Sequence, residues 1–353
     1  MRILVGDLGG THTRLALADL DATRVSLRQV TRYKNSEHAD LNAILADFLS
    51  HGETCAMADT NCCLAVAGPT DGHSVQFTNL DWRIETDALM QQFAFRRCRL
   101  INDFAAVGWG LNTLGPEALA TLQTGQAAAD GARVALGAGT GLGVSLCAWR
   151  GDLCGGHGGG HGGDHYQPLA SEGGHVGFAA CNSEQDRLLA YLRPLYGRVS
   201  VERILSGPGL VDLFRFCLRE SGNSGGHIVN QAANQATHPL LAAAHPAAAI
   251  SQAGLAQDDV VAAHCLRLFA EIYGQTAGDW ALAAQASGGI FLAGGIAPKL
   301  LPVLQNGVFL AAFNAKGRYS DWMTRVPVAV ILDPDIGLKG AAFAAANMAA
   351  QSW

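Results

Sequence analysis

The sequence lacks any apolar run that approaches the roughly 20 residues of a membrane-spanning helix. Its first residues also lack the order of basic, apolar and cleavage-site segments that is typical of a secretory signal. Charged residues are scarce, at 15%, and the formal net charge is -6. This balance disfavours a nucleic-acid backbone as the main partner. We therefore expect a cytoplasmic protein that binds neither membranes nor nucleic acids.

The sequence also lacks the closely spaced cysteine pairs that bind metal ions. The nine cysteines contain no CxxC spacing, and an odd number scattered through apolar segments predicts reduced thiols in the core rather than a disulfide framework. We assign none of them a catalytic role.

Hydrophobic residues make up 49% of the 353-residue chain, which suits a folded protein of two domains. Two segments, 3–18 and 134–148, each read as an apolar strand, a glycine turn and a second strand. Further strands are expected at 62–67, 99–101, 290–293 and 327–331. Helical spacing predicts helices at 185–196, 209–220, 240–249 and 259–286 and from residue 337 onward, with an exposed loop over 221–237.

Glycine turns follow three of these strands, at Asp7-Leu8-Gly9-Gly10-Thr11, at Gly139-Thr140-Gly141 and at Gly294-Gly295. Glycine lets backbone N–H groups approach an anion closely, and threonine adds a hydroxyl donor, so such turns are able to cradle phosphates. A Walker loop or a dinucleotide fingerprint requires a helix after its glycines, whereas a strand is expected here. The run GAGTGLG also fails the GxGxxG spacing, which argues against a dehydrogenase.

These motifs, taken in order, resemble those of the bacterial glucokinases, members of the hexokinase and actin-like ATPase superfamily. The resemblance rests on VGDLGGTHTRLALADL (5–20), INDFAAV (101–107), GAGTGLGVSL (137–146), SEGGHVGFA (171–179), VSVERILSGPGLVDLF (199–214), FLAGGIAPK (291–299) and KGRYS (316–320). It implies an α/β fold of two domains, of the actin-like ATPase (ribonuclease H-like) type, with a cleft between them. The expected small domain comprises residues 1–110 plus 337–353, and the large domain comprises 111–336 with an inserted loop at 154–166.

The same resemblance implies the chemistry: phosphorylation of the 6-hydroxyl of D-glucose by ATP with Mg²⁺. Asp103 matches the catalytic aspartate of the family's NDF motif, although a helix N-cap is the alternative interpretation of that residue. A hexose site needs carboxylates, amides and imidazole; the candidates are Asn102, Asp103, Glu172, His175 and Glu202, with Asn79 as a further contact.

For the nucleotide, the resemblance assigns Asp7 to Mg²⁺ and Gly6 to Thr11 to one part of the phosphate chain. Gly139, Thr140 and Gly141 would hold the other part, and Gly294 and Gly295 would lie against the adenosine. Arg14 faces either the phosphates or a surface ion pair. A homodimer is also implied.

Two other functions stay open at this stage. The first is a kinase for another hexose or an amino sugar, and the second is a sugar-binding regulator without catalysis. A sugar-responsive repressor is disfavoured because no helix-turn-helix segment precedes the strand at Ile3.

The segment from Gly155 to Gly163 contains seven glycines and two histidines. His157, His161 and His165 have a metal-ligand spacing on a helix, but seven glycines would destabilise that helix by about 7 kcal/mol relative to alanine. We therefore interpret the three histidines as part of a flexible inserted loop and assign only His175 to the sugar site.

Overall fold

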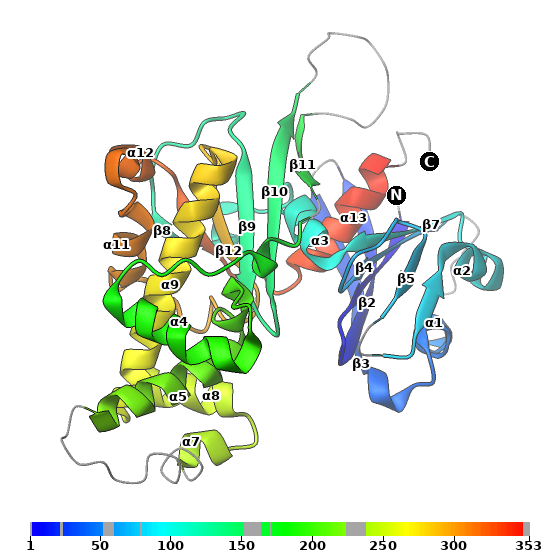
Figure 1. Cartoon of the computed structure of the whole chain (residues 1–353). Helices are drawn as coiled ribbons and strands as arrows, with labels where there is room; N and C mark the ends of the chain where they lie inside the picture. Colours follow the sequence, from blue (N-terminus) through cyan, green and yellow to red (C-terminus); the bar gives the residue numbers. More distant parts are fainter. Residues whose placement is uncertain are drawn as a thin grey trace. The chain divides into compact units, whose positions relative to one another are not determined.

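The computed structural model describes residues 2–21, 24–51, 60–77, 80–151, 164–169, 171–223 and 238–348. The chain forms two compact units (Figure 1). Unit 1 comprises residues 1–118, 145–171 and 333–353, and unit 2 comprises residues 119–144 and 172–332. The main difference from the domains expected above is segment 145–171, which groups with the first unit.

Unit 1 is built on a five-stranded sheet of order β3-β2-β1-β4-β7. Strand β1 pairs antiparallel with β2 and parallel with β4, and β4 pairs parallel with β7. The strands are β1 (Arg2–Leu8), β2 (His12–Asp21), β3 (Arg24–Lys34), β4 (Asn61–Val66) and β7 (Arg97–Asn102), and a separate hairpin comprises β5 (Ser74–Gln76) and β6 (Arg83–Glu85).

Alternating side chains of this sheet pack against helices on its two faces, as the period of two in a strand requires. Leu4 belongs to a core cluster with residues of α1 (Leu41–Ser50) and α2 (Thr86–Phe93). Its neighbours Ile3 and Val5 belong to a second cluster with residues of α3 (Asp103–Gly110) and α13 (Ile336–Met348).

Helices α3 and α13 approach each other very closely. A Cβ atom added at Gly340 would lie 1.8 Å from the Ala106 carbonyl oxygen, so only glycine fits there. The hairpin of β10 (Leu142–Arg150) and β11 (His165–Leu169) also packs on α3. Asn112, just after α3, receives a hydrogen bond from the Tyr166 backbone N–H at 2.7 Å. These contacts explain why segment 145–171 joins unit 1.

Unit 2 contains the strand order β9-β12-β13-β8, with β9, β12 and β13 parallel and β8 antiparallel at the edge. These strands are β8 (Leu119–Gln123), β9 (Arg133–Ala138), β12 (Gly289–Ala293) and β13 (Val328–Ile331). The helices are α4 (Ser183–Tyr196), α5 (Gly207–Asn223), α7 (Pro239–Ala242), α8 (Pro246–Ala256), α9 (Val260–Ala284), α10 (Leu301–Leu304), α11 (Val308–Asn314) and α12 (Ser320–Met323). The long α9 packs against α5, α8 and α11 (Figure 1).

The expected strands and most of the expected helices are confirmed. The single helix predicted over 240–249 is wrong, because the chain forms α7 and then α8, which starts at Pro246, a residue that favours the first turn of a helix. The loop predicted from Ser221 is also partly wrong, since α5 continues to Asn223; residues 224–237 lie outside the described ranges.

His165 does not belong to a loop, contrary to the expectation. It lies in β11 opposite Arg150, and its ring stacks on Trp109 with a centroid distance of 5.6 Å. His157 and His161 lie outside the described residues.

The cysteines in the described ranges carry free thiols. All are buried except Cys181, which is exposed and is an exception to the expected core position. No helix in the described part of the chain is long and apolar enough to cross a membrane.

Candidate active site

The first glycine turn joins β1 to β2 in unit 1. The Gly9 N–H donates to the His12 carbonyl at 3.0 Å and closes a tight hairpin, so a strand follows the glycines as expected. Residues 9–11, called here the 9–11 turn, have two exposed members, Gly10 and Thr11. Both residues are therefore accessible to a ligand from solvent.

Asn35, the residue directly after β3, fixes this turn through three hydrogen bonds. Its side-chain amide donates to the Gly9 carbonyl at 2.8 Å and accepts from the Thr13 hydroxyl at 2.9 Å. Its backbone N–H donates to the Thr11 carbonyl at 3.0 Å. Asn35 is buried, so the position of the 9–11 turn depends on a residue that the motif comparison did not identify.

Asp7 lies in β1 just before the turn. Its carboxylate lies beside the first turn of α13, with Oδ2 at 4.0 Å from where a Gly337 Cβ would be. Burial raises the pKa of Asp7 above its ordinary value, and the charge of Arg14 opposes this shift. Arg14 itself forms an ion pair with Asp335 and donates to the Pro334 carbonyl at 2.9 Å, which favours the ion-pair interpretation of this residue.

Asn102 and Asp103 lie where β7 passes into α3. Leu8, Val66 and Asn102 are consecutive partners in the parallel register of β1, β4 and β7. The carboxyl ends of these strands therefore meet at one edge of the sheet, which is the usual location of ligand sites in open α/β sheets. The Asn102 amide donates to the Gly68 carbonyl in the loop after β4, at 3.3 Å.

The N-cap of α3 is Asn102. Its side-chain oxygen accepts from the backbone N–H groups of Phe104 at 2.9 Å and Ala105 at 3.0 Å. Asp103 occupies the first turn and accepts from the Phe104 N–H at 2.8 Å. The alternative interpretation of Asp103 as the N-cap is therefore wrong, because its neighbour fills that position.

The second glycine turn, residues 139–141, begins at the end of β9 in unit 2. The Gly139 N–H donates to the Gly141 carbonyl, and the Gly139 carbonyl accepts from the Gly207 N–H, both at 2.8 Å. Gly294 and Gly295 follow the neighbouring strand β12 and are exposed. The Ile296 N–H donates to the Ala138 carbonyl at 3.3 Å, which brings this third turn beside the second.

Glu202 connects the 139–141 turn to His175. Its Oε2 atom accepts from the Leu142 backbone N–H at 2.9 Å, and its Oε1 atom lies 3.9 Å from His175 Nδ1. A Cβ atom at Gly141 would lie 2.5 Å from Glu202 Oε2. The contact requires glycine at that position.

Glu172 precedes a short 3-10 turn at residues 173–175, His175 is the last residue of that turn, and both side chains belong to exposed residues. A Cβ atom at Gly174 would lie 1.9 Å from the Leu142 carbonyl oxygen, so this turn rests directly on the backbone that also binds Glu202. Leu142 therefore connects the second glycine turn to both segments of the expected sugar site.

A divalent cation fits the chemistry at Asp7. In the described ranges, no group of three or more histidine, cysteine, aspartate or glutamate side chains is arranged to hold a metal. Mg²⁺ does not need such a cage, because it commonly binds one or two carboxylates together with substrate phosphates and water. A buried carboxylate with a raised pKa is also stabilised by a nearby positive charge.

The structure thus groups the candidates within each unit. Unit 1 contains Gly6 to Thr11, Asn102 and Asp103, and unit 2 contains Gly139 to Gly141, Glu172, His175, Glu202, Gly294 and Gly295. Asn79 lies outside the described residues. The motif comparison missed Asn35, which carries no sequence signal, and Gly207, whose motif ERILSGPG was recognised without a role for this residue.

Comparisons with known proteins identify the family of the chain. A family model described as Glucokinase matches residues 4–348. The glucokinase of Synechocystis sp. is 37% identical and that of Nostoc punctiforme 36% identical, each alignment covering 98% of this chain and 98% and 99% of the relative.

Solved structures are similar as well. A glucokinase from an Antarctic psychrotroph shares 30% identity with a TM-score of 0.78, covering 98% of this chain and 99% of its own. A ROK family glucokinase from Streptomyces griseus, in complex with glucose and AMPPNP, shares the fold at a TM-score of 0.61 and 20% identity, covering 97% and 98% of the two chains. The expected actin-like ATPase fold is confirmed, and the chain belongs to the glucokinase family.

Proposed function

We propose that this protein transfers the γ-phosphoryl group of ATP to the 6-hydroxyl of D-glucose, with Asp103 as the general base. The activity of a glucokinase follows from the family, whose curated members match almost the whole chain. The roles of individual residues are supported above all by one observation: Glu202 accepts from the Leu142 N–H, directly after the 139–141 turn, and lies 3.9 Å from His175. Groups suited to phosphate and to sugar are therefore adjacent in unit 2.

The hexose hydroxyls are bound by Asn102, Asp103, Glu172, His175 and Glu202, with Asn79 as a further contact. Each hydroxyl both donates and accepts, so carboxylates and amides together satisfy it. Asp103 accepts the proton of the 6-hydroxyl while that oxygen attacks the γ-phosphorus. The bond from this phosphorus to the bridging oxygen breaks, and ADP leaves with the electron pair.

The phosphates of ATP are bound by the backbone N–H groups of the 9–11 and 139–141 turns, and the adenosine lies against Gly294 and Gly295. The nucleotide role is supported by the AMPPNP complex of the Streptomyces griseus neighbour, which shares this fold. Mg²⁺, bound through Asp7, supplies charge neutralisation for the phosphates when present. The domains 1–110 with 337–353 and 111–336 and a homodimeric state are proposed on the family resemblance, although segment 145–171 groups with the first unit in the structure. A cytoplasmic location is proposed from the sequence features described above.

A coupled assay of ADP release across glucose, mannose, fructose, glucosamine and N-acetylglucosamine tests the substrate. We expect glucose to be preferred and its product to be oxidised by glucose-6-phosphate dehydrogenase. Preference for another sugar would favour the kinase for a different hexose or amino sugar. Activity with none of them would favour a sugar-binding regulator.

The role of Asp103 is tested by Asp103→Asn, which keeps the shape of the side chain and removes the base. We expect glucose binding, measured by calorimetry, to persist while kcat falls by roughly 10² to 10⁴, the usual contribution of a general base. This change leaves the N-cap hydrogen bonds of Asn102 in place. We therefore expect the variant to fold normally, and its thermal stability is the control measurement. Unchanged turnover would refute the assignment.

A further inference from the structure

Residues 176–181, called here the segment, directly follow His175. They are hydrogen-bonded to residues 199–201, which directly precede Glu202. The Phe178 N–H donates to the Val199 carbonyl, and the Val201 N–H donates to the Val176 carbonyl, both at 3.0 Å. His175 and Glu202 are each one residue from this pairing. The register of the two segments therefore determines how far apart these two side chains lie.

On its other side, the same segment is held by two buried glutamines from two helices. Gln275 of α9 donates its side-chain N–H to the Ala179 carbonyl at 2.6 Å. Gln185 of α4 accepts from the Cys181 N–H at 2.9 Å. The exposed fractions are 5% for Gln275 and 1% for Gln185. The two glutamine side chains are therefore shielded from solvent, whereas Ala179 and Cys181 themselves belong to the exposed side of the segment.

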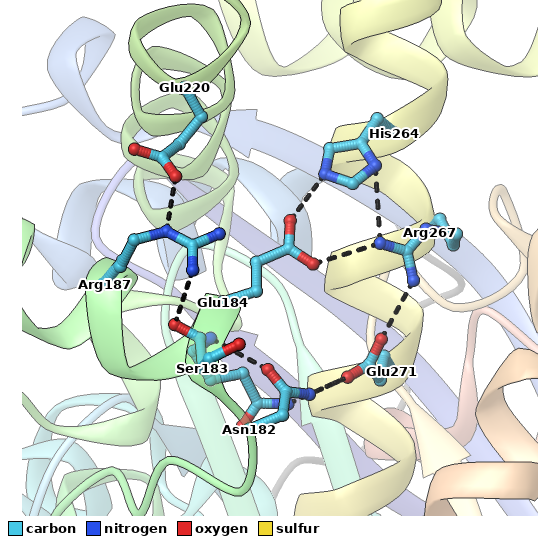
Figure 2. A network of polar contacts seen from close by, with 9 residues as sticks. Asn182, Ser183, Glu184, Arg187, Glu220, His264, Arg267 and Glu271 are labelled. Carbon is cyan, nitrogen blue, oxygen red and sulfur yellow. Dashed lines mark hydrogen bonds and ion pairs between the residues drawn. The ribbon is translucent and has the colours of Figure 1, made fainter. Parts of the chain in front are cut away.

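A network of charged and amide groups fixes the helices that carry these glutamines (Figure 2). Glu271 of α9 accepts from Gln185 at 3.1 Å and from Asn182 at 2.7 Å, and Arg267 donates to it at 3.0 Å. Arg267 also binds Glu184 of α4 at 3.2 Å. Helices α4 and α9 thus form one polar junction immediately after the segment.

Apolar packing against the segment is incomplete. A cavity of about 230 Å³ that is open to solvent is lined by Val176 and Phe178 of the segment, by Val201, and by Gln275 and Trp280 of α9. Close packing normally fixes the position of side chains in a protein. Because the open cavity leaves part of the segment without such packing, the position of the segment depends more strongly on its few hydrogen bonds.

We propose that Gln275 is a positioning residue for the hexose site: through the Ala179 carbonyl it holds the segment that sets His175 against Glu202. The inference rests on the proposed sugar-binding roles of His175 and Glu202. Lys316 strengthens this arrangement, because its ammonium group donates to the backbone carbonyl of Gln275 at 2.9 Å and pairs with Asp279. Lys316 therefore helps to fix the backbone at Gln275.

The test is Gln275→Leu, which puts a slightly shorter apolar side chain in place of the amide and leaves the Ala179 carbonyl without its donor. We expect the KM for glucose to rise roughly 5- to 10-fold, the effect of losing one partly buried hydrogen bond. The KM for ATP and kcat should change less than about threefold, and the preference for glucose over mannose should fall. Thr276→Val is the matched control, because it alters the wall of the same cavity and leaves the Gln275 amide in place.

Two further variants separate the possible outcomes. His175→Ala tests the site itself: if it leaves the KM for glucose unchanged, the proposed role of His175 is wrong. If His175→Ala raises this KM while Gln275→Leu does not, only the positioning role is overturned. An equal rise in Thr276→Val would also overturn it. Should Gln275→Leu fail to fold, Gln185→Leu removes the second anchor, and a normal KM for glucose in that variant would refute the proposal.

Discussion

Gly141→Ala tests the contact on which the residue assignments depend most. The new methyl group would lie 2.5 Å from Glu202 Oε2, whereas ordinary contacts of a Cβ atom begin at 3.4 Å. The glutamate side chain must therefore retreat by about 0.9 Å. That movement breaks or stretches its hydrogen bond to the Leu142 N–H, now 2.9 Å long.

The magnitude follows from the nature of that bond. A hydrogen bond to a charged group contributes about 1.5–3 kcal/mol, and displacing a binding group by about 1 Å costs up to about 100-fold. We therefore expect kcat/KM for glucose to fall roughly 10- to 100-fold in Gly141→Ala. The measurement is steady-state kinetics with glucose varied at saturating ATP, and then with ATP varied at saturating glucose.

Gly139→Ala is the matched comparison within the same turn. A Cβ atom at Gly139 meets nothing within 4 Å, so this substitution leaves Glu202 undisturbed. We expect it to raise the KM for ATP by obstructing the approach of phosphate, and to leave the KM for glucose unchanged. If Gly141→Ala and Gly139→Ala changed the KM values for glucose and ATP in the same way, the role of Glu202 in connecting the 139–141 turn to the sugar site would be refuted.

Two predictions concern unit 1. Asn35→Asp keeps the acceptor for the Thr13 hydroxyl but replaces the donor to the Gly9 carbonyl with an oxygen. We expect the KM for ATP to rise roughly tenfold and the KM for glucose to stay unchanged. A normal KM for ATP would show that the 9–11 turn does not need the hydrogen bond from Asn35. Because the pKa of Asp7 in the folded state lies above its ordinary value of 3.8, the folded protein holds the extra proton between these two values, and the contribution of Asp7 to stability falls as pH rises through that window. Asp7→Asn should therefore raise the thermal midpoint of the ligand-free protein at pH 7 and abolish the additional stabilisation by Mg²⁺ with ATP; a lower midpoint in scanning calorimetry would contradict the burial argument.

The arrangement of strands and glycine turns was largely predictable from the sequence. Apolar runs such as Cys62–Val66 have few alternatives to a buried strand, and β1 and β2 join through a turn whose glycines mark it. The identities of Glu172, His175 and Glu202 came from motifs. The contact of Glu202 with the residue after the second glycine turn could not be predicted, because Glu202 and Leu142 are 60 residues apart in the sequence.

Other features escaped prediction for physical reasons. Asn35 stands among polar residues in NSEHAD, and nothing in that context indicates that its amide is buried against a turn 26 residues earlier. His165 was grouped with a glycine-rich tract by its spacing, but aromatic stacking on Trp109 and pairing in β11 determine its position. In each case a tertiary contact overrides the local pattern.

The close approach of α13 to α3 has a consequence for biosynthesis. Unit 1 takes its sheet from the first third of the chain, yet one face of that sheet is covered by residues 336–348. While the ribosome is still translating, Ile3, Val5 and Ala106 lack the partners that α13 provides. Asp7 likewise lacks the helix start beside it. A nascent chain stalled before residue 336 would therefore display an apolar sheet face, a substrate for chaperones, and catalytic competence would arise only when the final helix docks.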